Sequence, residues 1–188
     1  MNGVAGPTAA PAPATPDPVM LGRGLAALRI FFGLILFSNG LAKLLEFRNV
    51  EVGPYRSFLI NRAEARGILE FETNRRGGDG TDVPGLEALV NDVILPSYDV
   101  MQWITTFLEL GTGLALIVGL ASRGAALLAL GQQLFLQVLY LSSGRWMFEQ
   151  PHEWVPLLIL TLVPAGRIWG LDARFARHGL RRWRGFPF

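Results

Sequence analysis

The 188-residue chain has no cysteine and only two histidines, His152 and His178. Without cysteine it has no thiolate ligands for zinc or an iron–sulfur cluster, and it has no disulfide or Cys-x-x-Cys redox chemistry. With only these two histidines, the chain also cannot supply the two axial ligands of a bis-histidine haem buried between helices. We therefore expect no haem, no iron–sulfur cluster, no zinc and no other bound metal.

Charged residues are scarce as well. They make up 17% of the chain against 51% hydrophobic residues, a balance unlike that of an average soluble domain. The net charge of +2 comes from 17 basic residues, of which 16 are arginine. Many of these arginines border apolar runs, which favours a partner that is a lipid bilayer and not a nucleic acid.

Four apolar runs are candidates for membrane spans, because a bilayer core of about 30 Å needs roughly 20 helical residues. They cover residues 25–45, 98–120, 124–143 and 154–171. The fourth is the shortest, and Pro164 is expected to kink it. The predicted fold is an all-α integral membrane four-helix bundle, with its membrane domain at residues 21–171.

The regions outside the spans have their own compositions. Residues 1–20 are rich in proline and alanine, so we expect a disordered tail. Residues 172–188 mix arginine with aromatic residues, which is typical of a basic tail on an anionic membrane surface. Residues 46–97 form a long outer loop, in which residues 84–95 are expected to form a short interfacial helix at the outer end of the bundle.

The arginines also predict the orientation. Near the span ends, nine arginines lie on one side of the membrane: Arg23, Arg29, Arg123, Arg167, Arg174, Arg177, Arg181, Arg182 and Arg184. Three lie on the other side: Arg48, Arg56 and Arg145. Positive charge marks the cytoplasmic side. We expect a multi-pass protein of the cell membrane with both termini in the cytoplasm.

Polar residues inside the spans are the candidates for function. Glu109 lies near the middle of its span, where a charged carboxylate costs on the order of 3 kcal/mol and needs a partner, and Gln132 or Gln133 lies at a similar depth. The candidate pocket for a ligand head group or a proton path consists of Asn39, Lys43, Glu109, Gln133 and Gln137. The alternative is that these side chains only join helices through hydrogen bonds.

Two further groups have simpler interpretations. Gly111, Ala115 and Gly119 repeat every four residues, a spacing typical of close helix packing. Arg145, Glu149, His152 and Glu153 crowd a short outer loop, either as an acid–base set near the interface or as an ordinary solvated loop.

Three stretches resemble the DoxX family of small membrane proteins, which includes the DoxX-like small subunit of thiosulfate:quinone oxidoreductase, DoxD. They are LRIFFGLILFSNGLAKLL in the first span, a Glu-and-Gly pattern in the second span, and GRIWGLDARF after the fourth. The residues that carry the resemblance are Arg29, Gly33, Gly40, Lys43, Glu109, Gly113, Gly119 and Asp172.

The resemblance implies a subunit of a redox or electron-transfer assembly that interacts with quinone, beside one or more partner subunits, and that is not catalytic alone. In that function Asn39, Lys43 and Gln137 would donate hydrogen bonds to the quinone, and Glu109 would carry protons. Two alternatives stay open. The first is a non-catalytic scaffold that anchors partner proteins, and the second, with less support, is a small proton-coupled transporter.

Overall fold

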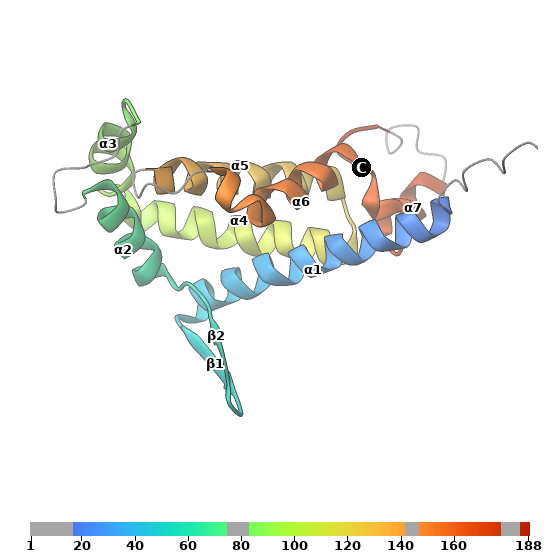
Figure 1. Cartoon of the computed structure of the whole chain (residues 1–188), viewed down its shortest axis with the longest axis horizontal. Helices are drawn as coiled ribbons and strands as arrows, with labels where there is room; N and C mark the ends of the chain where they lie inside the picture. Colours follow the sequence, from blue (N-terminus) through green and yellow to red (C-terminus); the bar gives the residue numbers. More distant parts are fainter. Residues whose placement is uncertain (1–16, 75–82, 142–146, 178–184) are drawn as a thin grey trace, which may run out of the picture.

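Four helices form the body of the protein. The computed structural model describes residues 17–74, 83–141, 147–177 and 185–188. Within these, α1 (Pro18–Leu45), α4 (Tyr98–Val118), α5 (Ser122–Tyr140) and α6 (Pro151–Leu162) run side by side along the long axis (Figure 1). The chain is therefore mostly helical, as the composition predicts.

Helix α1 begins earlier than the sequence indicated. Asp17 is its N-cap and accepts a hydrogen bond from the backbone N–H of Val19 at 2.9 Å, and Pro18 takes the first helical position. The prediction of a disordered tail is therefore wrong for Pro18 to Met20, because the cap and the proline start the helix there. Residues 1–16 lie outside the described part of the chain.

Glycines bring α1 and α4 together. A Cβ atom at Gly113 would lie 2.5 Å from the backbone nitrogen of Phe37, and one at Gly33 would lie 2.8 Å from that of Ile117. These helices approach so closely that only the hydrogen side chain of glycine fits between their backbones at these positions. The predicted packing stripe was wrong at Gly111, which is exposed and would meet nothing within 4 Å.

The fourth predicted span is shorter than expected. Helix α6 has 12 residues, or about 18 Å of rise, and ends just before Val163 and Pro164. A 3-10 turn, η4 (Ala165–Arg167), and a short helix, α7 (Leu171–Arg177), follow it. The proline stops the helix instead of kinking it, because residue 163 before it takes an extended conformation.

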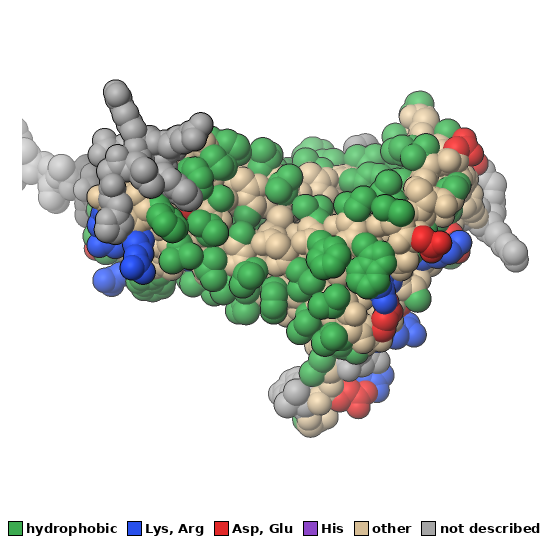
Figure 2. Space-filling model, turned by 180° about the vertical axis from the view of Figure 1, so that it is seen from behind, with side chains coloured by type: hydrophobic (Ala, Val, Ile, Leu, Met, Phe, Trp, Pro, Cys, Tyr) green, Lys and Arg blue, Asp and Glu red, His purple; other side chains and the backbone are tan. Residues whose placement is uncertain are grey.

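Two of the described helices, α1 and α4, are long and apolar enough to cross a membrane. Figure 2 shows apolar side chains along the length of the body, while most charged side chains gather at its two ends. This is the distribution that a bilayer around the middle requires. The four-span arrangement itself stays a prediction.

The outer loop contains more structure than expected. Strands β1 (Asn49–Val52) and β2 (Tyr55–Phe58) form an antiparallel hairpin that projects away from the helices (Figure 1). Helix α2 (Arg62–Thr73) follows, with a capping box in which Asn61 and Glu64 each bind the other's backbone N–H. The prediction of an all-α fold was therefore wrong for this hairpin.

The short helix expected at residues 84–95 is present in two parts: α3 (Leu86–Ala88) and the π-helical turn η1 (Leu89–Ile94). Leu86 and Val90 pack with Leu139 at the outer end of α5. Leu89 and Val93 were expected on the same face but are 44% and 51% exposed. The wider π-turn rotates them away from the cluster.

Candidate functional site

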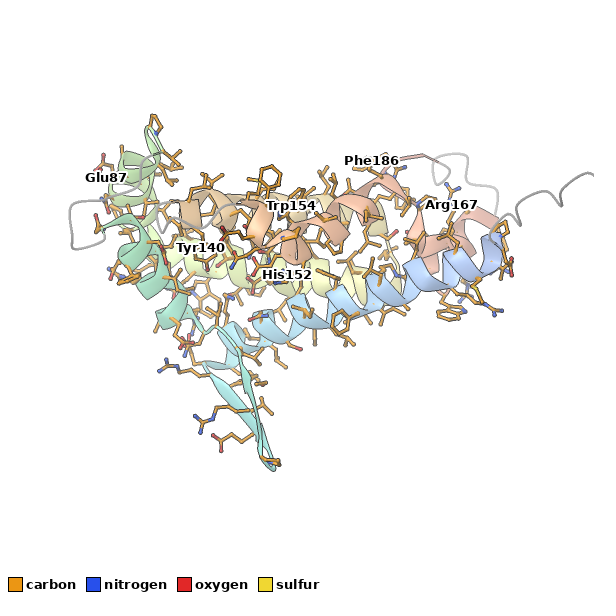
Figure 3. The ribbon with its side chains drawn as sticks, viewed as in Figure 1. Glu87, Tyr140, His152, Trp154, Arg167 and Phe186 are labelled. Carbon is orange, nitrogen blue, oxygen red and sulfur yellow. The ribbon has the colours of Figure 1, made fainter. Side chains whose placement is uncertain are left out.

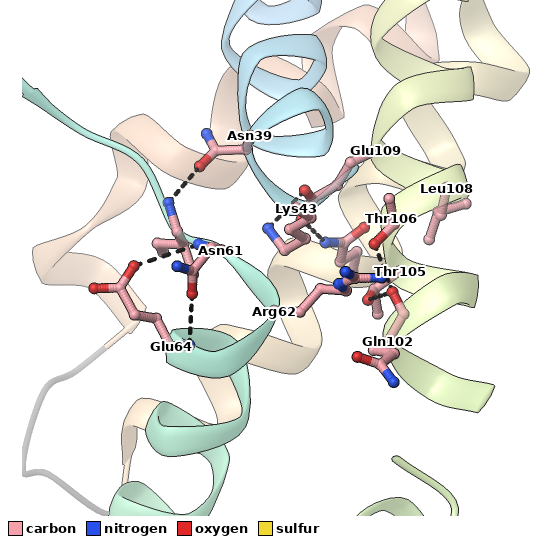
Figure 4. Close-up of polar contacts among 12 residues, drawn as sticks. Asn39, Lys43, Asn61, Arg62, Glu64, Gln102, Thr105, Thr106, Leu108 and Glu109 are labelled. Atoms are coloured by element: carbon pink, nitrogen blue, oxygen red, sulfur yellow. Dashed lines mark hydrogen bonds and ion pairs between the residues drawn. The ribbon is translucent and has the colours of Figure 1, made fainter. Parts of the chain in front are cut away.

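The centre of the site is a buried ion pair. The Nζ of Lys43 donates to Oε2 of Glu109 at 2.7 Å, and the Nε2 of Gln132 donates to Oε1 of the same carboxylate at 2.6 Å (Figure 4 draws the ion pair). Lys43 and Glu109 are only 5% and 6% exposed. Since an isolated buried charge is very costly, the ion pair offsets part of the cost of burying these two groups.

The glycine contact between α1 and α4 explains why the pair forms. A Cβ atom at Gly40 would lie 2.7 Å from the backbone nitrogen of Leu110, the residue next to Glu109. Lys43 follows Gly40 by about one helical turn, so its side chain starts on the face that touches α4. The backbone contact thus places a lysine against a glutamate from a distant part of the sequence.

The ion pair lies in the wall of a cavity of about 670 Å³. Polar lining comes from Asn39, Gln132 and Gln133 beside the pair, whereas most of the remaining lining is apolar. The Oε1 of Gln132 is buried and has no hydrogen-bond partner among the described residues. An apolar cavity with a few convergent polar groups is the usual form of a small-molecule site.

The structure brings together four of the five predicted pocket residues. Lys43, Glu109, Asn39 and Gln133 line the cavity. Asn39 also anchors the outer loop, since its Oδ1 accepts from the backbone N–H of Ile60 at 3.3 Å (Figure 4). The sequence left Gln132 and Gln133 open as partners of Glu109, and the structure selects Gln132.

Gln137 is placed differently. It is 1% exposed and does not line the cavity, and its Nε2 donates to Oε2 of Glu153 at 2.7 Å. Its rotation on α5 directs it toward α6 instead of Glu109. The pocket prediction was therefore wrong for Gln137, although its partner Glu153 does line the cavity.

The outer end of α6 contributes more than a solvated loop. His152 and Glu153 both line the cavity. Tyr140 of α5 lines the cavity as well, and Figure 3 labels both Tyr140 and His152. Arg145 of the same predicted set lies outside the described residues.

Helix α2 covers the outer end of the cavity with Ala65, Ile68 and Leu69. It is held in place by Arg62, whose guanidinium lies 4.2 Å from the ring centroid of Trp103 and forms an ion pair with Glu46. This helix was not predicted from the sequence. Its signal was the Asn-x-x-Glu capping box at residues 61–64, just before apolar residues at helical spacing.

Three further residues that carry the family resemblance, Arg29, Gly119 and Asp172, lie at the opposite end of the bundle. The Nη2 of Arg29 donates to the carbonyl of Trp169 at 3.1 Å, and Arg29 is fully buried. Asp172 accepts hydrogen bonds from the backbone N–H groups of Ala121 and Ser122, at 2.7 and 3.0 Å, at the start of α5. These contacts tie α1, α5 and α7 together, and a carboxylate at a helix N-terminus is favourable.

Gly119 belongs to the same end. Its φ of 68° is a left-handed conformation at the C-cap of α4, and a Cβ atom there would collide with the guanidinium of Arg29. Gly119, Arg29 and Asp172 therefore have structural contacts away from the cavity.

These features define a helical membrane protein with a buried ion pair in the wall of an apolar cavity. The DoxX family model matches residues 24–141, so the chain belongs to the DoxX family. The match includes α1, α4 and α5 and hence Lys43, Glu109 and Gln132, and it ends before α6. No curated protein and no solved structure matches the chain.

Proposed function

We propose that the protein is a quinone-interacting subunit of a membrane redox assembly. The observation that carries this proposal is the Lys43–Glu109 ion pair, which lies in the wall of a largely apolar cavity of about 670 Å³. Membership in the DoxX family supports the redox assignment. The candidate binding residues are Asn39, Lys43, Glu109 and Gln133, with Gln132 added by the structure.

The residues present fit a quinone. Its ring carbonyls need hydrogen-bond donors, and the ammonium of Lys43 keeps N–H groups beyond the one that binds Glu109. Gln133 adds an amide to the same wall, and apolar side chains surround the rest of the volume. When bound, the quinone supplies two-electron, two-proton chemistry.

The protein then controls position and protons. Lys43 would donate from Nζ to a ring carbonyl and so orient the head group, while Glu109 holds Lys43 in place through Oε2. Gln132 fixes the second carboxylate oxygen and so restricts rotation of Glu109. If Nζ gave a proton to the reduced head group, the Glu109 carboxylate would take up a proton from water and pass it to the neutral amine of Lys43, which makes Glu109 the candidate proton carrier.

The electron donor is assigned to a partner subunit, because the chain has no cysteine for thiol redox chemistry of its own. We place the protein in the cell membrane as a multi-pass subunit. The start of α1 and helix α7 lie at the same end of the bundle (Figure 1), where Arg23, Arg174 and Arg177 are also found. Positive charge at that end supports cytoplasmic termini.

The test is mass spectrometry of lipophiles and proteins that copurify with the chain in mild detergent. We expect near-stoichiometric quinone with the native protein and loss of quinone from Glu109→Gln and Lys43→Met variants that still fold. Glu70→Gln is the matched control, because it changes an exposed ion pair, with Arg66, on α2. Partner proteins without quinone, unaffected by these substitutions, would instead identify a scaffold and overturn the proposal.

A further inference from the structure

Different helices form the different walls of the cavity. Leu36 of α1 and Leu157 of α6 belong to the buried core and also line the cavity, which reaches further inward along α1 to Phe31 and Phe32. Toward the outer end, the lining passes to Asn39 and Lys43 on α1 and to His152 and Glu153 on α6. Helices α1 and α6 therefore form two opposing walls.

The inner ends of these walls are fastened together. Arg29 of α1 donates to the carbonyls of Ala165 and Trp169, which follow α6 in the chain. A Cβ atom at Gly22 would also collide with the side chain of Ile168. The two walls are thus joined at the inner end of the bundle, and the cavity begins just beyond this junction, at Phe31.

One edge of the cavity belongs to the outer surface of the bundle. Phe31 and Ile35 line the cavity but are 59% and 41% exposed. Both lie on α1 within a stretch apolar enough to cross a membrane. In a bilayer these two side chains would face lipid chains on one side and the cavity on the other.

The aqueous end is covered. Ala65, Ile68 and Leu69 of α2, with Ile60 and Ile94, line the cavity at its outer end. Tyr98 Oη donates to the carbonyl of Arg62 at 2.6 Å, and the side chains of Asn74 and Asn91 exchange two hydrogen bonds, of 3.0 and 2.9 Å. These contacts fix α2 to α4 and η1 as a roof of apolar side chains.

We propose that the ligand of this cavity enters sideways from the bilayer, through a portal at Phe31 and Ile35, and leaves its hydrocarbon tail there while its polar head reaches Lys43 and Glu109. The ligand class is a membrane-dissolved amphiphile, not a water-soluble substrate. Lys43 follows Phe31 by 12 residues, or about 18 Å of helix, which gives the length over which the head and the first part of the tail lie. The proposal rests on the proposed function only for the identity of the head as a quinone.

The experiment uses the whole chain in liposomes and two photoreactive probes. One is a palmitic acid with a diazirine on its chain, and the other is a charged, water-soluble diazirine. Cross-links are mapped by mass spectrometry at residues in the cavity, such as Phe32 and Phe135. We expect the lipid probe to label these residues and the water-soluble probe to leave them unlabelled.

Two tryptophan variants locate the portal. Ile35→Trp should slow cavity labelling by about tenfold, because it narrows the entrance without touching the ion pair. Leu34→Trp is the matched control, since Leu34 is the neighbouring residue, is 50% exposed and does not line the cavity. Ile35→Ala should speed labelling, and thermal unfolding of each variant shows whether it is folded.

Each result is informative. Equal labelling of Ile35→Trp and Leu34→Trp proteins, or cavity labelling by the water-soluble probe, would overturn the portal. An excess of long-tailed quinone should compete with the lipid probe. If the lipid probe enters through the portal but quinone does not compete, the portal is supported and the quinone assignment fails.

Discussion

The Lys43→Met substitution tests whether the buried pair is coupled. It removes the ammonium that neutralises Glu109 and leaves Gln132 as the carboxylate's donor among the contacts described. Breaking a buried pair by removing one partner typically costs about 3–5 kcal/mol, whereas replacing both partners by apolar side chains is often neutral. We therefore expect Lys43→Met to lose about 3 kcal/mol and Lys43→Met/Glu109→Leu to recover most of it.

The measurement is equilibrium unfolding in mixed micelles, with helical circular dichroism as the signal. Four proteins complete the cycle: the native chain, Lys43→Met, Glu109→Leu and the double variant. Because each single substitution is expected to cost about 3 kcal/mol and the double variant about 1 kcal/mol or less, their free energies of unfolding should give a coupling of about 5 kcal/mol. Glu70→Gln, on the exposed surface of α2, should change stability by less than about 1 kcal/mol.

The reasoning is refuted if the single substitutions add up to the double one. Additivity would mean that the two charges are separately solvated, through water in the cavity or by another partner. Lys43 would then not be the group that offsets the cost of burying Glu109.

Three further predictions concern the same protein. Gly113→Ala should lose about 1–3 kcal/mol in the same unfolding assay, because a Cβ atom would press on the backbone of α1, whereas Gly111→Ala on the same helix should be neutral or slightly stabilising. Asp172→Ala should cost about 1–2 kcal/mol and raise amide hydrogen exchange in the first turn of α5, and unchanged exchange there would contradict its role as a cap. Gln137→Leu should lower stability by about 1–3 kcal/mol by leaving Glu153 without its buried donor, but should not reduce quinone content, since Gln137 does not line the cavity.

Much of the helical body could be predicted from the chain alone. A long apolar run inside a bilayer must pair its backbone N–H and C=O groups within the segment, because no water is available there. The length and composition of these runs therefore predict helices. The same argument placed Glu109 at a depth where it needs a partner, and it identified Lys43 as a candidate in the same pocket. The family resemblance, confirmed by the match over residues 24–141, rests on these local features.

Three of the errors arise from short local patterns. Residues at a helix start, such as Asp17 and Pro18, carry a clear cap signal, but the composition of the tail obscured it. Pro164 was expected to bend a span, and it ended one. Leu89 and Val93 followed an ideal helical spacing that the π-turn interrupts. In each case a local change in backbone conformation or hydrogen bonding decides where a helix starts, where it ends or which way its side chains face.

The sequence by itself determined that apolar helices form, which polar residues they carry, and roughly how deep those residues lie, because these depend on local composition and on the rise of a helix. The tertiary structure decided which polar groups meet. Gln132 and not Gln133 binds Glu109, and Gln137 turns to Glu153, because the rotation of each helix is set by contacts with its neighbours. The cavity, its roof of α2 and its edge at Ile35 likewise exist only after distant segments pack together.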